Sequence, residues 1–229
     1  MVEDEQSAEP RHQLSTVEYV VERIREGLKQ GTYVGGQRLI EADLTEQYGA
    51  SRTSVREAIR RLSAEGLISI EHNRGAIVPI LTEADLVNIY EVREALESMS
   101  ARLAAKNAVA ESKSRLNVAF NALLAAQTAG DVKQYSDANE CFHDLIIKLS
   151  NNPHLVRLTS QLNIPIYRYR FQSMLNPSAV SESMKEHEAI FKAILANDAE
   201  SAEAAMKLHI QRSRQFVVGL LPRRRAERQ

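Results

Sequence analysis

"SRTSVREAIRRLSAEGLISI", residues 51–70, places four arginines within its first eleven positions, although the formal net charge of the whole chain is only −1. Ser51 suits an N-cap and Gly66 a stop signal, so the residues between them predict a helix. The apolar side chains of this helix recur on one face, which we expect to be buried: Val55, Ala58, Ile59 and Leu62. Arg52, Arg56 and Arg60 form a separate stripe that faces outward.

The segments around this helix predict a winged helix-turn-helix. A helix fits residues 15–29, three glycines in "GTYVGGQRL" end it, and "EADLTEQYG" suits a short second helix. Residues 67–70 and 76–78 have the pattern of two strands, joined by "EHNRG", in which Asn73 and Gly75 suit a hairpin tip. In such a domain the second motif helix enters the DNA major groove, and the hairpin, or wing, reaches a neighbouring groove or the backbone.

The pattern beyond Pro79 is helical to the end of the chain. Helices fit residues 83–108, 112–128, 131–150, 153–174, 179–196 and 199–219. The breaks between them resemble the short connections of an antiparallel bundle. Asn197 with Glu200 suggests a capping box for the last helix.

The sequence therefore predicts a mainly α protein with two domains. We expect a disordered N-terminus at 1–14, a winged helix-turn-helix at 15–80, an antiparallel all-α bundle at 81–220 and a basic tail at 221–229. The single cysteine, Cys141, excludes an internal disulfide and fits a reducing compartment. Since no apolar run approaches the roughly 20 residues of a membrane span, and the acidic start does not resemble a signal peptide, we expect a soluble cytoplasmic protein.

The arginine stripe has two explanations. The simpler one is a solvated helix face that pairs with Glu57 and Glu65. The alternative is contact with DNA, because a guanidinium can bind guanine in bidentate fashion and also binds phosphates. Thr53 and Ser54, near the helix start, can donate to phosphates or base edges. The surrounding winged-helix pattern favours DNA contact.

Three histidines of the helical part are predicted to face inward. His143 follows Asn139 by four residues, so both side chains project from one helix face. His187 and His209 also share their faces with apolar residues, and a buried imidazole needs a polar partner. These residues are either satisfied core histidines or ligands of a divalent metal ion, for which imidazole and an oxygen donor suit zinc, nickel or manganese. His154, near a helix start, suits a capping or surface role.

An inward arginine adds a second candidate contact. Arg93 shares its helix face with several leucine and isoleucine side chains. It can form a buried pair with Glu97, one turn further on, or hold the carboxylate of a bound effector. The motif "YRYRF" offers Arg168 and Arg170 as further anion contacts, unless either is simply exposed.

Longer motifs resemble a known family. "GTYVGGQRLIEADLTEQYGASRTSVREAIRRLSAEGLI", followed by "HNRGAIV", resembles the DNA-binding domain of the GntR family of bacterial transcription regulators. "VREALESMSARLAA", "NECFHDLI", "EHEAIFKAILANDAESA" and "KLHI" resemble its FadR-like subgroup, whose helical FCD domain binds effectors and dimerises. Ala42 stands where some relatives carry an arginine toward DNA, so that contact is not carried over.

The resemblance implies residue roles. Arg52 and Arg56 become the main DNA readers, and the full set expected at DNA is Ser51, Arg52, Thr53, Ser54 and Arg56 in the helix and His72, Arg74 and Gly75 in the wing. The subgroup's site of one Asp or Asn plus three histidines maps onto Asn139, His143, His187 and His209.

We therefore predict a metabolite-responsive regulator, a repressor, that binds a pseudo-palindromic DNA operator as a homodimer. A small organic acid at the divalent metal would change its DNA affinity. One alternative is a metalloenzyme, since a metal on three histidines can activate water, but the chain lacks an H-E-x-x-H motif and carries a DNA-binding module. The other is a regulator with a metal-free acyl pocket, which the inward histidines disfavour.

Overall fold

The computed structural model describes residues 15–221, and the chain divides into two compact units between Pro79 and Ile80. The predicted disordered segment, 1–14, and all but the first residue of the predicted basic tail lie outside the described residues. Each unit is described separately below.

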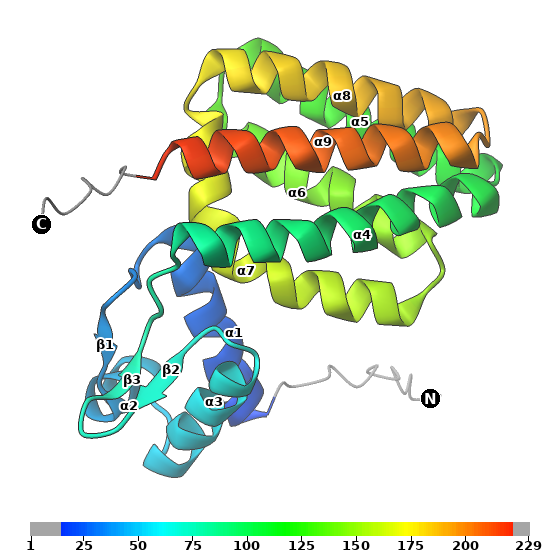
Figure 1. Ribbon diagram of the computed structural model, residues 1–229. Helices are drawn as coiled ribbons and strands as arrows, with labels where there is room; N and C mark the ends of the chain where they lie inside the picture. Colours follow the sequence, from blue (N-terminus) through cyan, green and yellow to red (C-terminus); the bar gives the residue numbers. More distant parts are fainter. Residues whose placement is uncertain (1–14, 222–229) are drawn as a thin grey trace, which may run out of the picture. The chain divides into compact units, whose positions relative to one another are not determined.

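The N-terminal unit combines helices with a small antiparallel sheet. Its elements are α1 (Thr16–Gln30), β1 (Arg38–Leu39), α2 (Glu41–Tyr48), α3 (Arg52–Ala64), β2 (Ser69–Glu71) and β3 (Gly75–Ile77) (Figure 1). The strand order is β1-β3-β2, so β3 is the central strand and pairs with both neighbours. The hairpin of β2 and β3 was predicted, whereas β1 was not, because two residues carry no recognisable alternation.

Local signals explain why α3 and the wing form where they do. The Ser51 side chain caps α3 by accepting a hydrogen bond from the Ser54 amide, 3.1 Å away. The predicted inward face of α3 is buried, as its sequence pattern indicated. At the hairpin tip Asn73 has a φ of 62° and Gly75 a φ of 77°, and both residue types tolerate this left-handed conformation. The unit is a winged helix-turn-helix.

The C-terminal unit is an all-α bundle. Its helices are α4 (Glu83–Asn107), α5 (Ala110–Ala129), α6 (Val132–Leu149), α7 (Pro153–Met174), α8 (Pro177–Leu195) and α9 (Ala199–Gly219). The predicted helices are all present, with ends that differ by at most two residues. Helix α9 lies alongside α4 and also packs against α8, while α5 packs against α6 (Figure 1). No helix within residues 15–221 is long and apolar enough to cross a membrane.

The predicted capping box at the start of α9 is wrong by one residue. Asp198 is the N-cap, and its side chain accepts a hydrogen bond from the Ser201 amide at 3.0 Å. Asn197 instead adopts a left-handed conformation, and its side-chain amide donates to the backbone oxygens of Ala105 and Ala108. Asn197 therefore ties the α8–α9 turn to the end of α4, a tertiary role that local sequence does not reveal.

Candidate functional site: three histidines, two arginines and an arginine-lined groove

Three imidazoles converge in the middle of the C-terminal bundle. Helices α6, α8 and α9 contribute His143, His187 and His209, which are 3%, 0% and 5% exposed. One ring nitrogen from each lies within 4.8 Å of the others. The Phe142 and His187 rings make a T-shaped contact, with the two ring centroids 5.5 Å apart. The three inward-facing histidines thus meet at one point.

Buried carboxylates fix the proton positions on two of these rings. Glu97 Oε2 lies 2.8 Å from Nδ1 of His143, and Glu186 Oε2 lies 2.9 Å from Nδ1 of His209. An ionised carboxylate only accepts, so each Nδ1 carries the proton and donates it. Nε2 of each ring then carries a lone pair, and that of His143 lies within hydrogen-bond distance of Nε2 of His187. This carboxylate–histidine arrangement is the one that orients imidazoles toward metals in proteins.

The environment keeps the imidazoles of His143 and His187 neutral. Burial lowers the pKa of His143 to about 4, although the nearby Glu97 carboxylate acts in the opposite direction. Burial also lowers the pKa of His187, and the neighbouring His209 and His143 add to the effect. A neutral imidazole is the form that binds a metal ion, so both rings are ready to bind at neutral pH without losing a proton.

The donor set fits a divalent transition metal. Nε2 of His143 and Nε2 of His187 are 3.1 Å apart. Two nitrogens bound to one zinc ion at about 2.1 Å in tetrahedral geometry are about 3.4 Å apart, so small movements would suffice. Three imidazoles suit zinc and nickel, and they suit manganese if oxygen ligands complete the coordination. The three histidines could hold such an ion.

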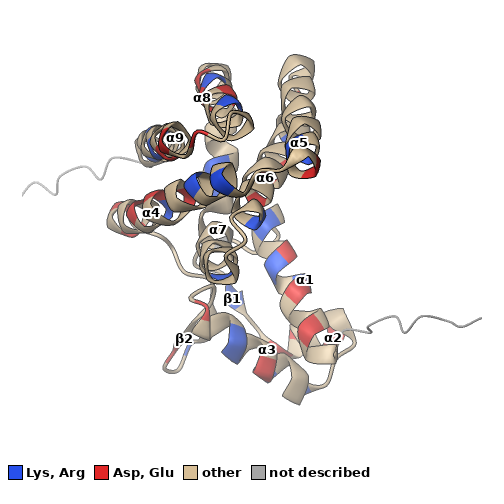
Figure 2. Cartoon of the chain, turned by 90° about the vertical axis from the view of Figure 1, so that its right-hand side faces the viewer, with Lys and Arg blue, Asp and Glu red and all other residues tan. Residues whose placement is uncertain are grey.

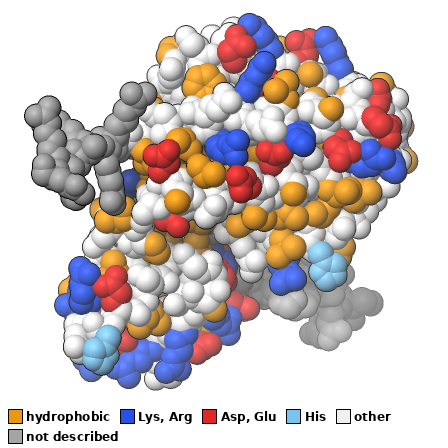
Figure 3. Space-filling model, in the orientation of Figure 1, with side chains coloured by type: hydrophobic (Ala, Val, Ile, Leu, Met, Phe, Trp, Pro, Cys, Tyr) orange, Lys and Arg blue, Asp and Glu red, His pale blue; other side chains and the backbone are white. Residues whose placement is uncertain are grey.

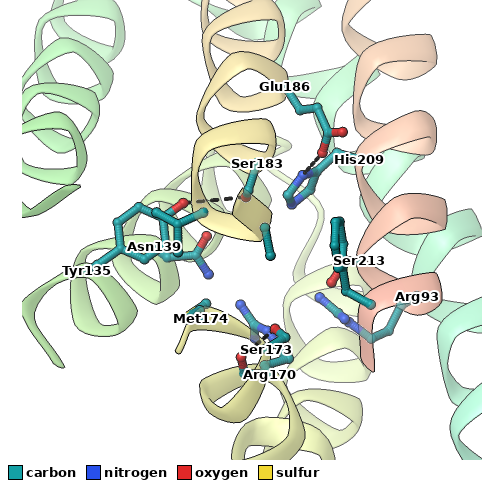
Figure 4. A pocket seen from close by; sticks show the side chains of 13 residues that line it. Arg93, Tyr135, Asn139, Arg170, Ser173, Met174, Ser183, Glu186, His209 and Ser213 are labelled. Carbon is teal, nitrogen blue, oxygen red and sulfur yellow. Dashed lines mark hydrogen bonds and ion pairs between the residues drawn. The ribbon is translucent and has the colours of Figure 1, made fainter. Parts of the chain in front are cut away.

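A small cavity adjoins His209. It has a volume of about 40 Å³, which is room for on the order of three water molecules. Its lining includes Asn139, Arg93 and Arg170, and Figure 4 shows both guanidinium groups directed toward the same space as the Asn139 amide. The structure thus brings Asn139 to the cavity beside the histidines, on the helix that also carries His143.

Arg93 both pairs with Glu97 and lines this cavity. Nε and Nη2 of Arg93 lie 2.8 and 2.7 Å from Oε1 of Glu97, with both side chains buried. Nη1 of Arg93 is buried without a hydrogen-bond partner among the described residues. Burial opposes ionisation of Glu97, but the Arg93 guanidinium and the hydrogen bond from His143 lower its pKa below the usual value. The pair is therefore charged, with one donor left over.

Arg170 adds a second positive charge to the cavity wall. It is 7% exposed, and burial together with the nearby Arg93 charge lowers its pKa. Glu97 pairs with Arg93 and accepts the hydrogen bond from His143. Glu97 and Glu140 both act on Arg170 through their charges. The carboxylate that lines the cavity, Glu186, is held by His209 and Arg212. The cavity wall therefore presents two buried guanidinium groups, and Nη1 of Arg93 is available to bind an anion.

The structure does not bring Arg168 to this cavity. Its guanidinium lies over the Tyr169 ring, 5.2 Å from the ring centroid, and it is absent from the lining. His154 is exposed at the start of α7, where Asn152 provides the cap. The sequence analysis missed Glu186. It predicted that Glu97 could pair with Arg93, but it missed the contact between Glu97 and His143. The available signal was an acidic residue directly before His187.

The predicted DNA-reading arginines line a groove in the N-terminal unit. The groove has a volume of about 700 Å³, and its walls come from β1, α2, α3 and the wing. Arg52, Arg56 and Arg60 are exposed along it, and Gly75 of the wing lies opposite. Figure 3 shows positive side chains gathered on this unit, and Figure 2 shows them on α3. Arg38, which sequence reasoning missed, also lines the groove.

The arginines predicted to contact DNA differ in whether they form ion pairs within the protein. Arg56 Nε lies 2.7 Å from Glu41 Oε2, and Arg74 Nη1 lies 2.8 Å from Glu71 Oε2, so both are held in exposed ion pairs. Arg52 forms no ion pair with another described residue.

The hydroxyl and wing candidates are also placed. Ser51 and Ser54 hydrogen-bond to each other at the start of α3, which reduces their freedom to bind DNA. Thr53 and His72 are exposed.

Comparisons with known proteins agree with this architecture. The family model described as "Bacterial regulatory proteins, gntR family" matches residues 16–78, and the FCD domain model matches residues 88–212. McbR, a transcriptional regulator of Escherichia coli, is 31% identical over 77% of this chain and 81% of its own. The galactonate operon transcriptional repressor of the same species is 28% identical over 84% and 92%. The solved structure of McbR/YncC covers 90% of this chain and 98% of its own, with a TM-score of 0.77 and 28% identity.

Proposed function

This chain belongs to the GntR family of bacterial transcriptional regulators, with a C-terminal FCD domain, and we propose that it is a cytoplasmic repressor controlled by an organic acid. In this proposal a homodimer binds a pseudo-palindromic operator, and the acid binds beside a divalent metal ion in the C-terminal bundle. The family relationship makes the chain a regulator and not an enzyme.

One observation carries the effector proposal: three imidazoles converge beside two buried guanidinium groups, and Nη1 of Arg93 has no hydrogen-bond partner among the described residues. A metal ion on neutral ligands keeps its full positive charge, so metal and arginines together would favour a carboxylate. Asn139 is the proposed fourth protein ligand. The metal would supply a Lewis-acidic position for the acid's oxygens, while Arg93 and Arg170 would orient the carboxylate.

The cavity size suggests how binding reaches the DNA-binding unit. A cavity of about 40 Å³ cannot enclose a whole organic acid, so groups that line it must move when one binds. An effector acts only through different affinities for two states, and this small cavity would belong to the state with weaker acid binding.

The test is calorimetry on the untagged full-length chain after chelator treatment. Zinc should bind at one ion per chain, and 2-hydroxybutyrate should bind to zinc-loaded but not to metal-free protein. If the acid binds the zinc-loaded and the metal-free protein with equal affinity, the metal has no part in binding the acid.

Arg52→Ala and Arg56→Ala are expected to weaken specific DNA binding. If each contacts a base edge, the loss should be about 1–3 kcal/mol of discrimination against non-specific DNA. The measurement is fluorescence anisotropy with an operator selected from random duplexes. Arg61→Ala is the matched control, because Arg61 lies outside the groove and faces Glu57. Specificity that stays intact in both groove variants would rule out this readout.

Arg74→Ala in the wing should behave differently from the groove variants. A phosphate contact carries no sequence information, so binding should weaken by a similar factor on operator and random DNA, and the salt dependence should flatten. Titrations on both duplexes at several salt concentrations measure this. A loss confined to the operator would instead assign Arg74 to base recognition.

We expect the homodimer to form through the face shared by α4 and α7. Val92 and Met99, one heptad apart on α4, are 50% and 42% exposed, and Leu158 on α7 is 38% exposed. Figure 3 shows hydrophobic side chains gathered along α4. A pseudo-palindromic operator has two half-sites about one helical turn of DNA apart, and two DNA-binding domains are needed to bind both. An exposed apolar face suits contact with a second copy of the chain.

Sedimentation of the full chain tests this surface. The wild type should be a dimer at low micromolar concentration, and Met99→Glu should dissociate it by burying a charge in the interface. Val118→Glu, on α5 at a position that is 68% exposed, is the control and should remain dimeric. If the Met99→Glu protein is still a dimer, the interface lies on another face.

A further inference from the structure

A second, larger cavity in the C-terminal unit shares walls with the one beside His209. Its volume is about 260 Å³, against about 40 Å³ for the inner cavity. Tyr135, Met174 and Val180 line both. We call the two spaces the inner cavity and the outer chamber. In Figure 4, Tyr135 and Met174 lie on the side of the inner cavity away from Arg93, while Arg170 lies closer to Met174.

The two spaces differ in chemistry. The polar groups that line the inner cavity are two guanidinium groups, an imidazole, an amide, several hydroxyls and the Glu186 carboxylate, which is already paired with His209 and Arg212. The outer chamber is walled mainly by apolar groups, including Ala126, Val132, Leu175 and Pro177. Its one carboxylate, on Asp131, already accepts a hydrogen bond from the Gln134 amide at 2.9 Å, as the cap of α6. A ligand that spans both spaces would meet charge at one end and hydrocarbon at the other.

We propose that the effector is an acid with an apolar tail of several carbons, whose tail occupies the outer chamber. This inference rests on the proposed function, because the inner cavity supplies the site for the head group. A carboxylate has three heavy atoms, which matches the room of the inner cavity. The tail would then pass Tyr135 and Met174, which line both spaces.

The shared wall is able to open. Met174 is the last residue of α7 and has an unbranched side chain with three rotatable bonds. The Tyr135 hydroxyl donates to Ser183 Oγ over 3.4 Å, a long hydrogen bond whose loss costs little. Movement of these two side chains would join the spaces without breaking a buried ion pair.

The outer chamber also selects against a polyhydroxylated acid. Hydroxyl groups placed against its apolar walls would lose their bonds to water without replacement. Each methylene of an alkyl tail placed there should instead tighten binding about three- to fourfold. The chain should therefore prefer alkyl acids over sugar acids.

Calorimetry on the zinc-loaded full-length protein tests the proposal, with 2-hydroxybutyrate, 2-hydroxyhexanoate, 2-hydroxyoctanoate and gluconate as probes. We expect affinity to rise along the alkyl series until the chamber is filled, and gluconate to bind more weakly than 2-hydroxyhexanoate. Leu175→Glu, which places a charge at the 59%-exposed rim, should flatten the rise while 2-hydroxybutyrate still binds. Leu175→Met should preserve the rise.

Leu124→Glu makes the same change on α5 outside both cavities, at a position that is 44% exposed, and should leave the whole series unchanged. If all the acids bind with equal affinity, or gluconate binds tightest, the tail chamber is contradicted while the head-group site stands. If none of the acids binds, the proposed acid site itself fails, and the chamber proposal with it.

Discussion

His187→Ala is expected to remove the metal ion and the response to acid together. His187 is fully buried, and its Nε2 lies 3.1 Å from that of His143. Losing a residue that hydrogen-bonds to a metal ligand lowers the metal affinity about 10–100-fold, and losing a ligand itself should lower it further. Elemental analysis of untagged protein and zinc titration measure the effect, which should exceed a hundredfold.

His154→Ala is the matched control for this prediction. It makes the same substitution at an exposed position at the start of α7 and should retain one ion per chain. Circular dichroism of both variants checks that the bundle is still folded. If folded His187→Ala protein keeps a full complement of metal, the three histidines are core residues joined by hydrogen bonds.

Arg93→Met should be the most destabilising single change in the bundle. It leaves Glu97 fully buried and without its guanidinium partner, and breaking a buried pair on one side typically costs about 3–5 kcal/mol. Urea unfolding of the metal-free protein, followed by a probe in the C-terminal unit, should show this loss.

Two companion variants separate charge from packing. Arg93→Met combined with Glu97→Gln removes the uncompensated charge and should recover part of the loss. Lys133→Met, at an exposed pair with Asp137, should change the free energy of unfolding by less than about 1 kcal/mol. If the single and double variants are equally unstable, lost packing rather than buried charge is responsible.

The sequence predicted the fold well where periodicity was strong. The helices and the inward positions of His143, His187 and His209 follow from apolar residues that recur at helical spacing. The two-residue strand β1 and the tertiary hydrogen bonds of Asn197 depend on partners far away in sequence, so no local pattern could reveal them.

The candidate site was predictable in part. The sequence analysis treated Arg168 and Arg170 alike, yet side chains two positions apart on an α-helix point in directions about 200° apart. Only Arg170 could therefore face the cavity that Arg93 lines. The contacts of Glu97 and Glu186 with two imidazoles bring together α4 with α6 and α8 with α9, and only the assembled bundle shows them.

The most direct test of acid control is operator binding by zinc-loaded protein with and without the tightest-binding 2-hydroxy acid, measured by fluorescence anisotropy. Saturating acid should change the operator affinity of the wild type at least fivefold, the lower end of typical coupling between sites. It should leave the affinity of His187→Ala unchanged. Operator affinity that is the same with and without acid in the wild type, or that shifts equally in His187→Ala, would contradict control through the histidine site.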